Sequence, residues 1–215
     1  MQTQIAHSTL RWNAIKAGTN VFYANGANRA AVNTALTLTL QRKVTRSLLK
    51  QNARMITNVV GSTPSYNTQP IEAAFIAICH SDMDAVVRGL AGYVNPKQYG
   101  QTTPWENEIG SVESVRYLRS TLFTPFADAG GTAGGNFLST TGTNCDVYPI
   151  IFIAMDAFAV VPLKGQNSIV PMVANPKPSA GDALGQRGTV GWKAMQATQI
   201  LNDNWLVRAE VAVPL

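Results

Sequence analysis

The stretch "WLVRAEVAV", from Trp205 to Val213, has an apolar side chain at every second position. Arg208 and Glu210 fall between these apolar positions. Because successive side chains of a strand point to opposite faces, this period of two predicts a half-buried strand with Arg208 and Glu210 on its outer face. Trp205 is expected to lie in the core beneath that strand.

Segments before this stretch also predict β structure. Thr189 to Leu201 is expected to be the first strand of a closing hairpin, with "NDN" at 202–204 as its turn. Tyr148 to Val161 is an apolar run that predicts buried β structure. Its interruption by Asp156 leaves it too short for a membrane-spanning helix. Lys164 to Gly188 is rich in Pro and Gly and predicts a loop.

The middle of the chain alternates strand, helix and loop patterns. "AAFIAIC" (Ala73 to Cys79) predicts a buried strand, and "HSDMDAVVRGL" after it predicts a short helix with Ser81 as N-cap. Glu108 to Ser120 predicts strand pieces with an irregularity between them. The Gly-rich stretch from Ala127 to Asn144 predicts a long loop.

One long helix is predicted, from Thr39 to Arg54. Its N-cap is expected to be Thr39, whose hydroxyl can accept a hydrogen bond from a free backbone N–H. Apolar residues recur every four positions and form one stripe: Leu40, Val44 and Leu48. Residues 1–38 are small, polar and weakly patterned, which predicts an extended arm or loop, with a turn-favouring Asn25-Gly26 step.

A basic stripe lies opposite the apolar stripe of this predicted helix. It consists of Arg42, Arg46, Lys50 and Arg54. One interpretation is a solvated helix face. The other is a surface that faces nucleic acid, where spaced cations neutralise phosphates without reading the base sequence. No aromatic residues interleave with the stripe, so base stacking is not indicated.

The composition favours association. Of 215 residues, 46% are hydrophobic and only 13% are charged. Soluble domains carry roughly 25% charged residues, so a free monomer of this kind is poorly protected against association. A subunit that covers its surface with copies of itself is favoured over a small enzyme with a neutral surface. The net charge of +5 is compatible with a polyanionic partner.

The cysteine pattern and the chain start suggest the compartment. Cys79 and Cys145 lie far apart in apolar surroundings, so buried free thiols are expected, with a disulfide as the alternative. The sequence from Met1 shows no basic region followed by an apolar run. The protein is therefore expected to be cytosolic where it is made.

Candidate catalytic residues do not cluster in the sequence. His80, at a strand-to-helix junction, is a candidate general base, but the alternative is a histidine bonded near a helix start. Asp82 and Asp84 do not share a helix face and suit a first helical turn. Glu106 and Glu108 lack a companion and are expected to be surface loop carboxylates. No grouping has metal-ligand spacing, so no metal or cofactor is expected.

Six segments, taken in order, resemble the major capsid proteins of tailed bacteriophages in the branch named after the coliphage "N-four". They cover nearly the whole chain: Leu10 to Gly26, Leu36 to Ala53, Pro70 to Arg88, Glu108 to Ser120, Asp146 to Leu163 and Leu184 to Ala212. The resemblance implies an α+β protein with the Hong Kong ninety-seven capsid fold. That fold has a spine helix, a peripheral β-sheet, an α/β axial domain, an N-terminal arm and an extended loop. The arm and loop are expected to be reduced here.

The resemblance also implies a division of the chain. Residues 1–38 are the extended arm or loop segment, 39–70 and 185–215 form the peripheral domain, and 71–184 form the axial domain with its long loops. The predicted helix from Thr39 to Arg54 is then the spine helix or its first half.

The implied function is structural, not enzymatic. The chain is expected to self-assemble through pentamers and hexamers into an icosahedral head that encloses double-stranded DNA. Its implied partners are copies of itself, the packaged DNA by non-specific contact, and a decoration or scaffolding protein, with no membrane. Its implied place is the virion capsid, after synthesis and assembly in the host cytoplasm. Two alternatives stay open: an encapsulin-like nanocompartment shell, and a small α/β enzyme that uses His80.

Overall fold

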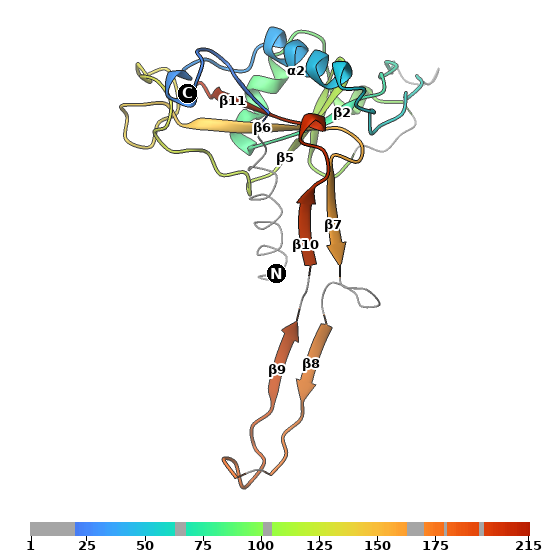
Figure 1. Ribbon diagram of the computed structural model, residues 1–215, viewed down its shortest axis with the longest axis vertical. Helices are drawn as coiled ribbons and strands as arrows, with labels where there is room; N and C mark the ends of the chain where they lie inside the picture. Colours follow the sequence, from blue (N-terminus) through green and yellow to red (C-terminus); the bar gives the residue numbers. More distant parts are fainter. Residues whose placement is uncertain (1–19, 63–67, 101–104, 163–169, 179, 194–195) are drawn as a thin grey trace. The chain divides into compact units, whose positions relative to one another are not determined.

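The computed structural model describes residues 20–62, 68–100, 105–162, 170–178, 180–193 and 196–215 (Figure 1). The chain divides into two compact units, one of Met1–Phe158 with Ile200–Leu215 and one of Ala159–Gln199. Among the described residues, none of the helices is long and apolar enough to cross a membrane.

A seven-stranded mixed sheet is the centre of the first unit. Its strands, in spatial order, are β1 (Val21–Tyr23), β11 (Leu206–Ala212), β6 (Val147–Ile153), β2 (Phe75–Cys79), β5 (Val115–Arg119), β4 (Glu108–Val112) and β3 (Tyr93–Val94). The helices among the described residues are α2 (Leu38–Lys50) and α3 (Asp84–Arg88), with 3-10 turns η1 (Arg29–Ala31), η2 (Ser81–Met83), η3 (Pro96–Gln98) and η4 (Asp203–Trp205). Helix α2 lies across one face of the sheet (Figure 1).

Strand β11 pairs with β6 antiparallel and with β1 parallel. The predicted hairpin is therefore wrong, because the strand before the turn, β10 (Gln196–Ile200), pairs instead with β7 (Phe158–Pro162). The predicted alternation of β11 is present: Val207, Ala209 and Val211 pack in the main core beside α2. A strand with a neighbour on each side belongs inside a sheet, where a hairpin partner has no free edge to bind.

The predicted outer face of β11 is also buried. Glu210 is 0% exposed and Arg208 is partly buried, because residues 20–37 and the Gly-rich loop cover this face. Period-two alternation cannot distinguish a strand with one buried face from a strand whose second face carries a buried ion pair. Trp205 is half-buried rather than fully buried, and its Nε1 donates to the carbonyl of Gln51 at 2.9 Å.

Arg29 is the main counterion of Glu210. Its Nε and Nη2 each donate to one carboxylate oxygen at 2.7 Å, and its guanidinium lies 3.5 Å from the centre of the Phe126 ring. Arg208 Nε lies 2.9 Å from Glu210 Oε1. Residues 20–37 are therefore folded against the sheet, and Val32 is fully buried. The rest of the predicted arm, residues 1–19, lies outside the described residues.

The Asn25-Gly26 step does not connect two paired strands. It follows β1, whose described partner is β11, and precedes η1. Gly26 has a φ of +71°, and a Cβ there would meet Ala31 Cβ at 2.4 Å. The glycine therefore serves a tight bend that returns the chain to the sheet.

Helix α2 begins earlier and ends earlier than predicted. Its N-cap is Thr37, whose hydroxyl accepts from the N–H of Leu40, so the prediction of Thr39 is wrong by two residues. The pattern offered threonines at both positions, and only the extended backbone at Thr37 allows capping. The predicted stripe is confirmed, since Leu40, Val44 and Leu48 are all buried.

The buried face of α2 also carries a polar side chain. Gln41 is 1% exposed and donates from Nε2 to the carbonyl of Val112 at 2.8 Å. Its Oε1 accepts from the hydroxyl of Tyr117, also at 2.8 Å. Tyr117 is fully buried, and this burial raises its pKa well above the ordinary value. The network fixes the position of α2 over β4 and β5 because each of its buried polar groups has a partner.

The other predicted strands are largely confirmed. Strand β2 falls inside the predicted run from Ala73 to Cys79, and Glu108 to Ser120 divides into β4 and β5. The expected irregularity is a register shift at Glu108/Gly110. The run from Tyr148 to Val161 is two strands, β6 and β7, separated by a turn in which Asp156 has a φ of +61°.

The helix after β2 has a different cap from the predicted one. His80 Nδ1 accepts from the N–H of Asp82 at 3.3 Å, so His80 takes the place predicted for Ser81. Cys79 and Cys145 are buried free thiols, as predicted. Burial raises the pKa of Cys79 to about 12, which leaves it protonated and unreactive in the folded protein.

The second unit contains a two-stranded antiparallel ribbon of β8 (Val170–Ala174) and β9 (Thr189–Lys193). The prediction of a loop from Lys164 to Gly188 is therefore wrong for residues 170–174, which form β8. Residues 163–169 and 179 lie outside the described residues. Pro171 obscured this strand in the sequence, because proline within a run usually argues against a strand. An edge strand tolerates it.

We predict that Tyr117→Phe lowers the free energy of unfolding by about 1–3 kcal/mol, because Gln41 Oε1 then has no donor in the core. Urea unfolding measures the loss. The matched control is Tyr23→Phe, since the hydroxyl of Tyr23 makes no hydrogen bond among the described residues. Equal losses in the two variants would show that the Gln41 network does not stabilise the core.

We predict that Glu210→Gln lowers the free energy of unfolding by roughly 3 kcal/mol, because it leaves Arg29 without its buried counterion. Glu113→Gln is the control: Glu113 forms the same kind of pair with Arg42 at the surface, where solvent screens it. Thermal and urea unfolding are expected to show a much smaller loss for the control. A loss as large at Glu113 contradicts the importance of burial.

Candidate functional site

The exposed face of α2 carries most of the predicted basic stripe. Arg46 and Lys50 are exposed and have no ion-pair partner among the residues described. Arg42 is exposed too, but its Nε donates to Glu113 Oε1 at 3.0 Å and its Nη2 also binds that carboxylate. The hydrogen bonds from Arg42 lower the pKa of Glu113. The charge of Arg42 is therefore already neutralised within the chain.

In the structure, Arg54 is not part of the basic helix face, and Lys43 is. Arg54 is exposed but follows the end of α2, so it does not continue the stripe on that helix. Lys43 is exposed and lies on the same face as Arg46 and Lys50, at three-, four- and seven-residue spacings. Counting only every fourth residue missed Lys43. We call Lys43, Arg46 and Lys50 the basic surface of α2.

The ribbon of β8 and β9 exposes an apolar face. Pro171 lies opposite Trp192, and Val173 lies opposite Val190, so these four side chains share one face. All four are exposed, with Val190 at 82% and Trp192 at 56%. An isolated two-stranded ribbon is marginally stable in water, and a contiguous exposed apolar face usually marks an interaction surface.

His80 has the structural role that was the alternative to catalysis. Besides capping η2, its Nδ1 lies 3.1 Å from Asp82 Oδ2, and its ring centre lies 5.5 Å from that of Tyr148. Tyr148 donates its hydroxyl to the same Asp82 oxygen at 2.9 Å. Asp84 pairs with Arg88 one helical turn later. The two aspartates therefore face different partners, as their spacing predicted.

The prediction for Glu108 is wrong, because this residue lies in β4 and has companions. Its Oε1 accepts from the hydroxyl of Tyr99 at 2.6 Å, and its Oε2 accepts from the N–H of Trp105 at 3.0 Å. Burial, with the bond to Glu108, raises the pKa of Tyr99. Glu106 is exposed, as predicted. The strand that begins at Glu108 was predicted, but its companion Tyr99 was not, because Tyr99 lies nine residues earlier and outside that strand.

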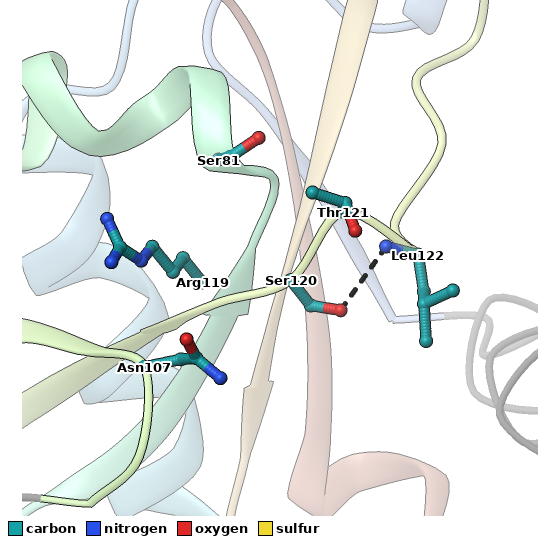
Figure 2. Close-up of a pocket in the computed structure, with 6 residues that line it drawn as sticks. All are labelled: Ser81, Asn107, Arg119, Ser120, Thr121 and Leu122. Atoms are coloured by element: carbon teal, nitrogen blue, oxygen red, sulfur yellow. Dashed lines mark hydrogen bonds between the residues drawn. The ribbon is translucent and has the colours of Figure 1, made fainter. Parts of the chain in front are cut away.

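A polar pocket of about 400 Å³ lies where β2 and β5 end (Figure 2). Its described lining residues are Ser81, Asn107, Arg119, Ser120, Thr121 and Leu122. The hydroxyl of Ser120 accepts from the N–H of Leu122 at 3.3 Å (Figure 2). These groups include one cation but no carboxylate or imidazole, so they do not form an acid–base pair. Among the described residues, no group of three or more His, Cys, Asp or Glu side chains is placed to hold a metal ion.

No family model and no curated protein matches the sequence. The fold, however, is similar to that of two solved phage structures. The first is the head structure of Helicobacter pylori bacteriophage KHP40, with a TM-score of 0.57, 10% identity and coverage of 99% of this chain and 65% of that chain. The second is the acid-stable capsid of Helicobacter pylori bacteriophage KHP30, with a TM-score of 0.57, 8% identity and coverage of 98% and 64%.

These similarities extend over nearly all of this chain but less than two thirds of either phage chain. At such low identity they show the fold. The predicted α+β class is confirmed at that level: a large sheet and few helices, arranged as in phage capsid folds.

Proposed function

We propose that the chain is a structural subunit of a bacteriophage head and that copies of it assemble into the shell. The observation that carries this proposal is the similarity in fold to two phage head proteins over 98–99% of the chain. In finer terms, we propose a Hong Kong ninety-seven fold of the "N-four" type, with α2 as the spine helix. The proposed role is geometric rather than enzymatic, and the proposed place is the virion capsid.

The apolar face of the β8–β9 ribbon supports assembly. Pro171, Val173, Val190 and Trp192 gain little from packing within their own unit, since all are exposed. Covering them by a second copy removes apolar area from water at about 25 cal/mol per Å². The low fraction of charged residues also supports assembly, because burying a charged side chain in an interface costs desolvation free energy.

We further propose the division predicted for the family, with 39–70 and 185–215 as the peripheral domain and 71–184 as the axial domain. Strands from both proposed domains share the seven-stranded sheet, as β11 and β6 do. Pentamers and hexamers are the proposed intermediates, made in the host cytoplasm. A decoration or scaffolding protein is a proposed further partner.

The proposed second partner is packaged double-stranded DNA, bound without base specificity. The predicted stripe of Arg42, Arg46, Lys50 and Arg54 is the proposed contact. Lys43 joins it on the helix, whereas Arg42 is already paired with Glu113 and Arg54 follows the end of α2. Helix α2 contains no acidic residue, so all of its charged side chains are basic. Spaced cations without interleaved aromatic side chains suit phosphate neutralisation.

We predict that Val190→Glu abolishes assembly, because it places a charge in a face that must be desolvated. Thr189→Glu is the control, since Thr189 is the neighbouring exposed residue on the opposite face of β9. Electron microscopy and sedimentation of the purified full chain report shells, capsomers or monomers. Shells formed equally by both variants would contradict assembly through this face.

We predict that replacing Lys43, Arg46 and Lys50 together by Gln reduces the salt dependence of DNA binding. The slope of log K against log salt is negative, and each lost phosphate contact reduces its magnitude by about 0.9, so the loss of three reduces it by roughly 2.7. Replacing Lys97, Lys177 and Arg187, which are exposed elsewhere, makes the same change in net charge. Equal slopes for both triple variants would show that the effect follows net charge and not α2.

The content of assembled particles tests the proposed role as a whole. Double-stranded DNA inside shells supports the phage head. Protein cargo with no DNA supports the nanocompartment alternative, and a chain that stays monomeric under all assembly conditions contradicts both.

A further inference from the structure

Arg116, in β5, is a buried cation with no described counterion. It is 2% exposed, and its buried Nε and Nη2 donate no hydrogen bond to any residue that the structure describes. Its guanidinium carbon lies 5.5 Å from the centre of the Tyr99 ring, which is its described partner. An ionised side chain buried without a counterion costs several kcal/mol, so native proteins pair nearly all of them.

Two other arginines of the chain pair with carboxylates. Arg29 uses Nε and Nη2 together to bind both oxygens of Glu210. Arg42 uses the same two nitrogens to bind Glu113. This edge of a guanidinium matches the two oxygens of a carboxylate, which makes such bidentate pairs strong and directional. At Arg116 the same edge has no acceptor within the described part of the chain.

The surroundings of Arg116 form a small cavity. It has a volume of about 270 Å³ and is lined by Thr57, Asn58, Val59, Val60, Trp105 and Arg116. Val59 is 69% exposed and Trp105 is 38% exposed, so part of the lining reaches the surface, whereas Arg116 is a buried member of it. The carboxylate of Glu108 accepts hydrogen bonds from Tyr99 and Trp105. It forms no ion pair with Arg116.

We propose that Arg116 is a binding site for a carboxylate, held by Nε and Nη2 after the rim side chains shift. The apolar walls from Val60 and Trp105 suit the carbon stem of a carboxylate-bearing group and strengthen its attraction to the cation by excluding water. The carboxylate comes either from an acidic side chain of a second copy of the chain or from a small molecule in solution. The site does not rest on the proposed role in a phage head.

The test is a titration of the full chain with sodium acetate at pH 7, with sodium chloride adjusted to hold the ionic strength constant. The signal is the Nε–H resonance of Arg116, identified by its loss in Arg116→Met. A saturable shift is expected for Arg116. The Nε–H of Arg42 is the internal control, and no saturable shift is expected there because Glu113 already occupies that edge.

Two variants extend the test to stability. Acetate is expected to raise the melting temperature of the wild-type chain above that in chloride, and to have no such effect on Arg116→Met. Without acetate, Arg116→Met is expected to melt at the same temperature or higher, because removing an unpaired buried charge is not destabilising. Arg116→Lys keeps the charge but lacks the fork, so its half-saturating acetate concentration is expected to rise roughly tenfold or more.

Sedimentation in the same acetate series distinguishes the sources. If a second copy donates the carboxylate, acetate competes with it, and both acetate and Arg116→Met reduce association. If a small molecule donates it, association is unchanged while the saturable shift persists. The proposal is overturned if the Arg116 Nε–H resonance shifts linearly with acetate concentration and shifts equally with chloride. Water would then be the hydrogen-bond acceptor of Arg116. Saturation by phosphate but not by acetate overturns the assignment to a carboxylate.

Discussion

The burial of β11 on both faces is the constraint on which the rest of the fold depends. One face packs against α2 in the main core, and the other carries the carboxylate of Glu210 out of contact with water. A buried carboxylate requires a partner, and Arg29 supplies it from a segment 181 residues away in sequence. The pair therefore fixes both the parallel pairing of β1 and the path of residues 20–37. The sheet reaches seven strands because its C-terminal strand lies inside it, where each face can be covered.

The polar groups in the core fix the position of α2 on the sheet as well as stabilise the fold. Gln41 could be replaced by an apolar residue without loss of helix propensity, yet its amide bonds both Tyr117 and the backbone of β4. These two bonds are satisfied in one register of α2 over the sheet, whereas apolar packing tolerates sliding. Helix position follows from this, and so does the direction of the exposed face that carries Lys43, Arg46 and Lys50.

Sequence patterns predicted the elements whose signals are local. The four-residue stripe of α2, the apolar run of β2 and the free thiols of Cys79 and Cys145 all depend on residues that are close in sequence. The pairing of β11 was not predictable in this way, since a strand next to a turn looks the same whether its partner precedes the turn or lies elsewhere. Glu210 was assigned to solvent because charge usually means exposure, and Arg29, which reverses that rule, is far away in sequence. Strand β8 was hidden by Pro171, and Arg116 was not recognised because a single arginine in a strand gives no signal of burial.

The low charge of the chain has two different structural causes, and they bear differently on function. Within the first unit, few charges are needed because much of the sheet is covered, and Glu210 and Arg116 are exceptions whose partners must be accounted for individually. In the ribbon of β8 and β9 the large apolar side chains Met172, Val173, Val190 and Trp192 are more than half exposed, although two strands alone bury too little area to be stable. The low charge thus reflects apolar side chains that are buried in a core in the first unit, and apolar side chains that lack a complete core in the second. The proposed assembly from further copies of the same chain would cover this exposed face and so complete that second core.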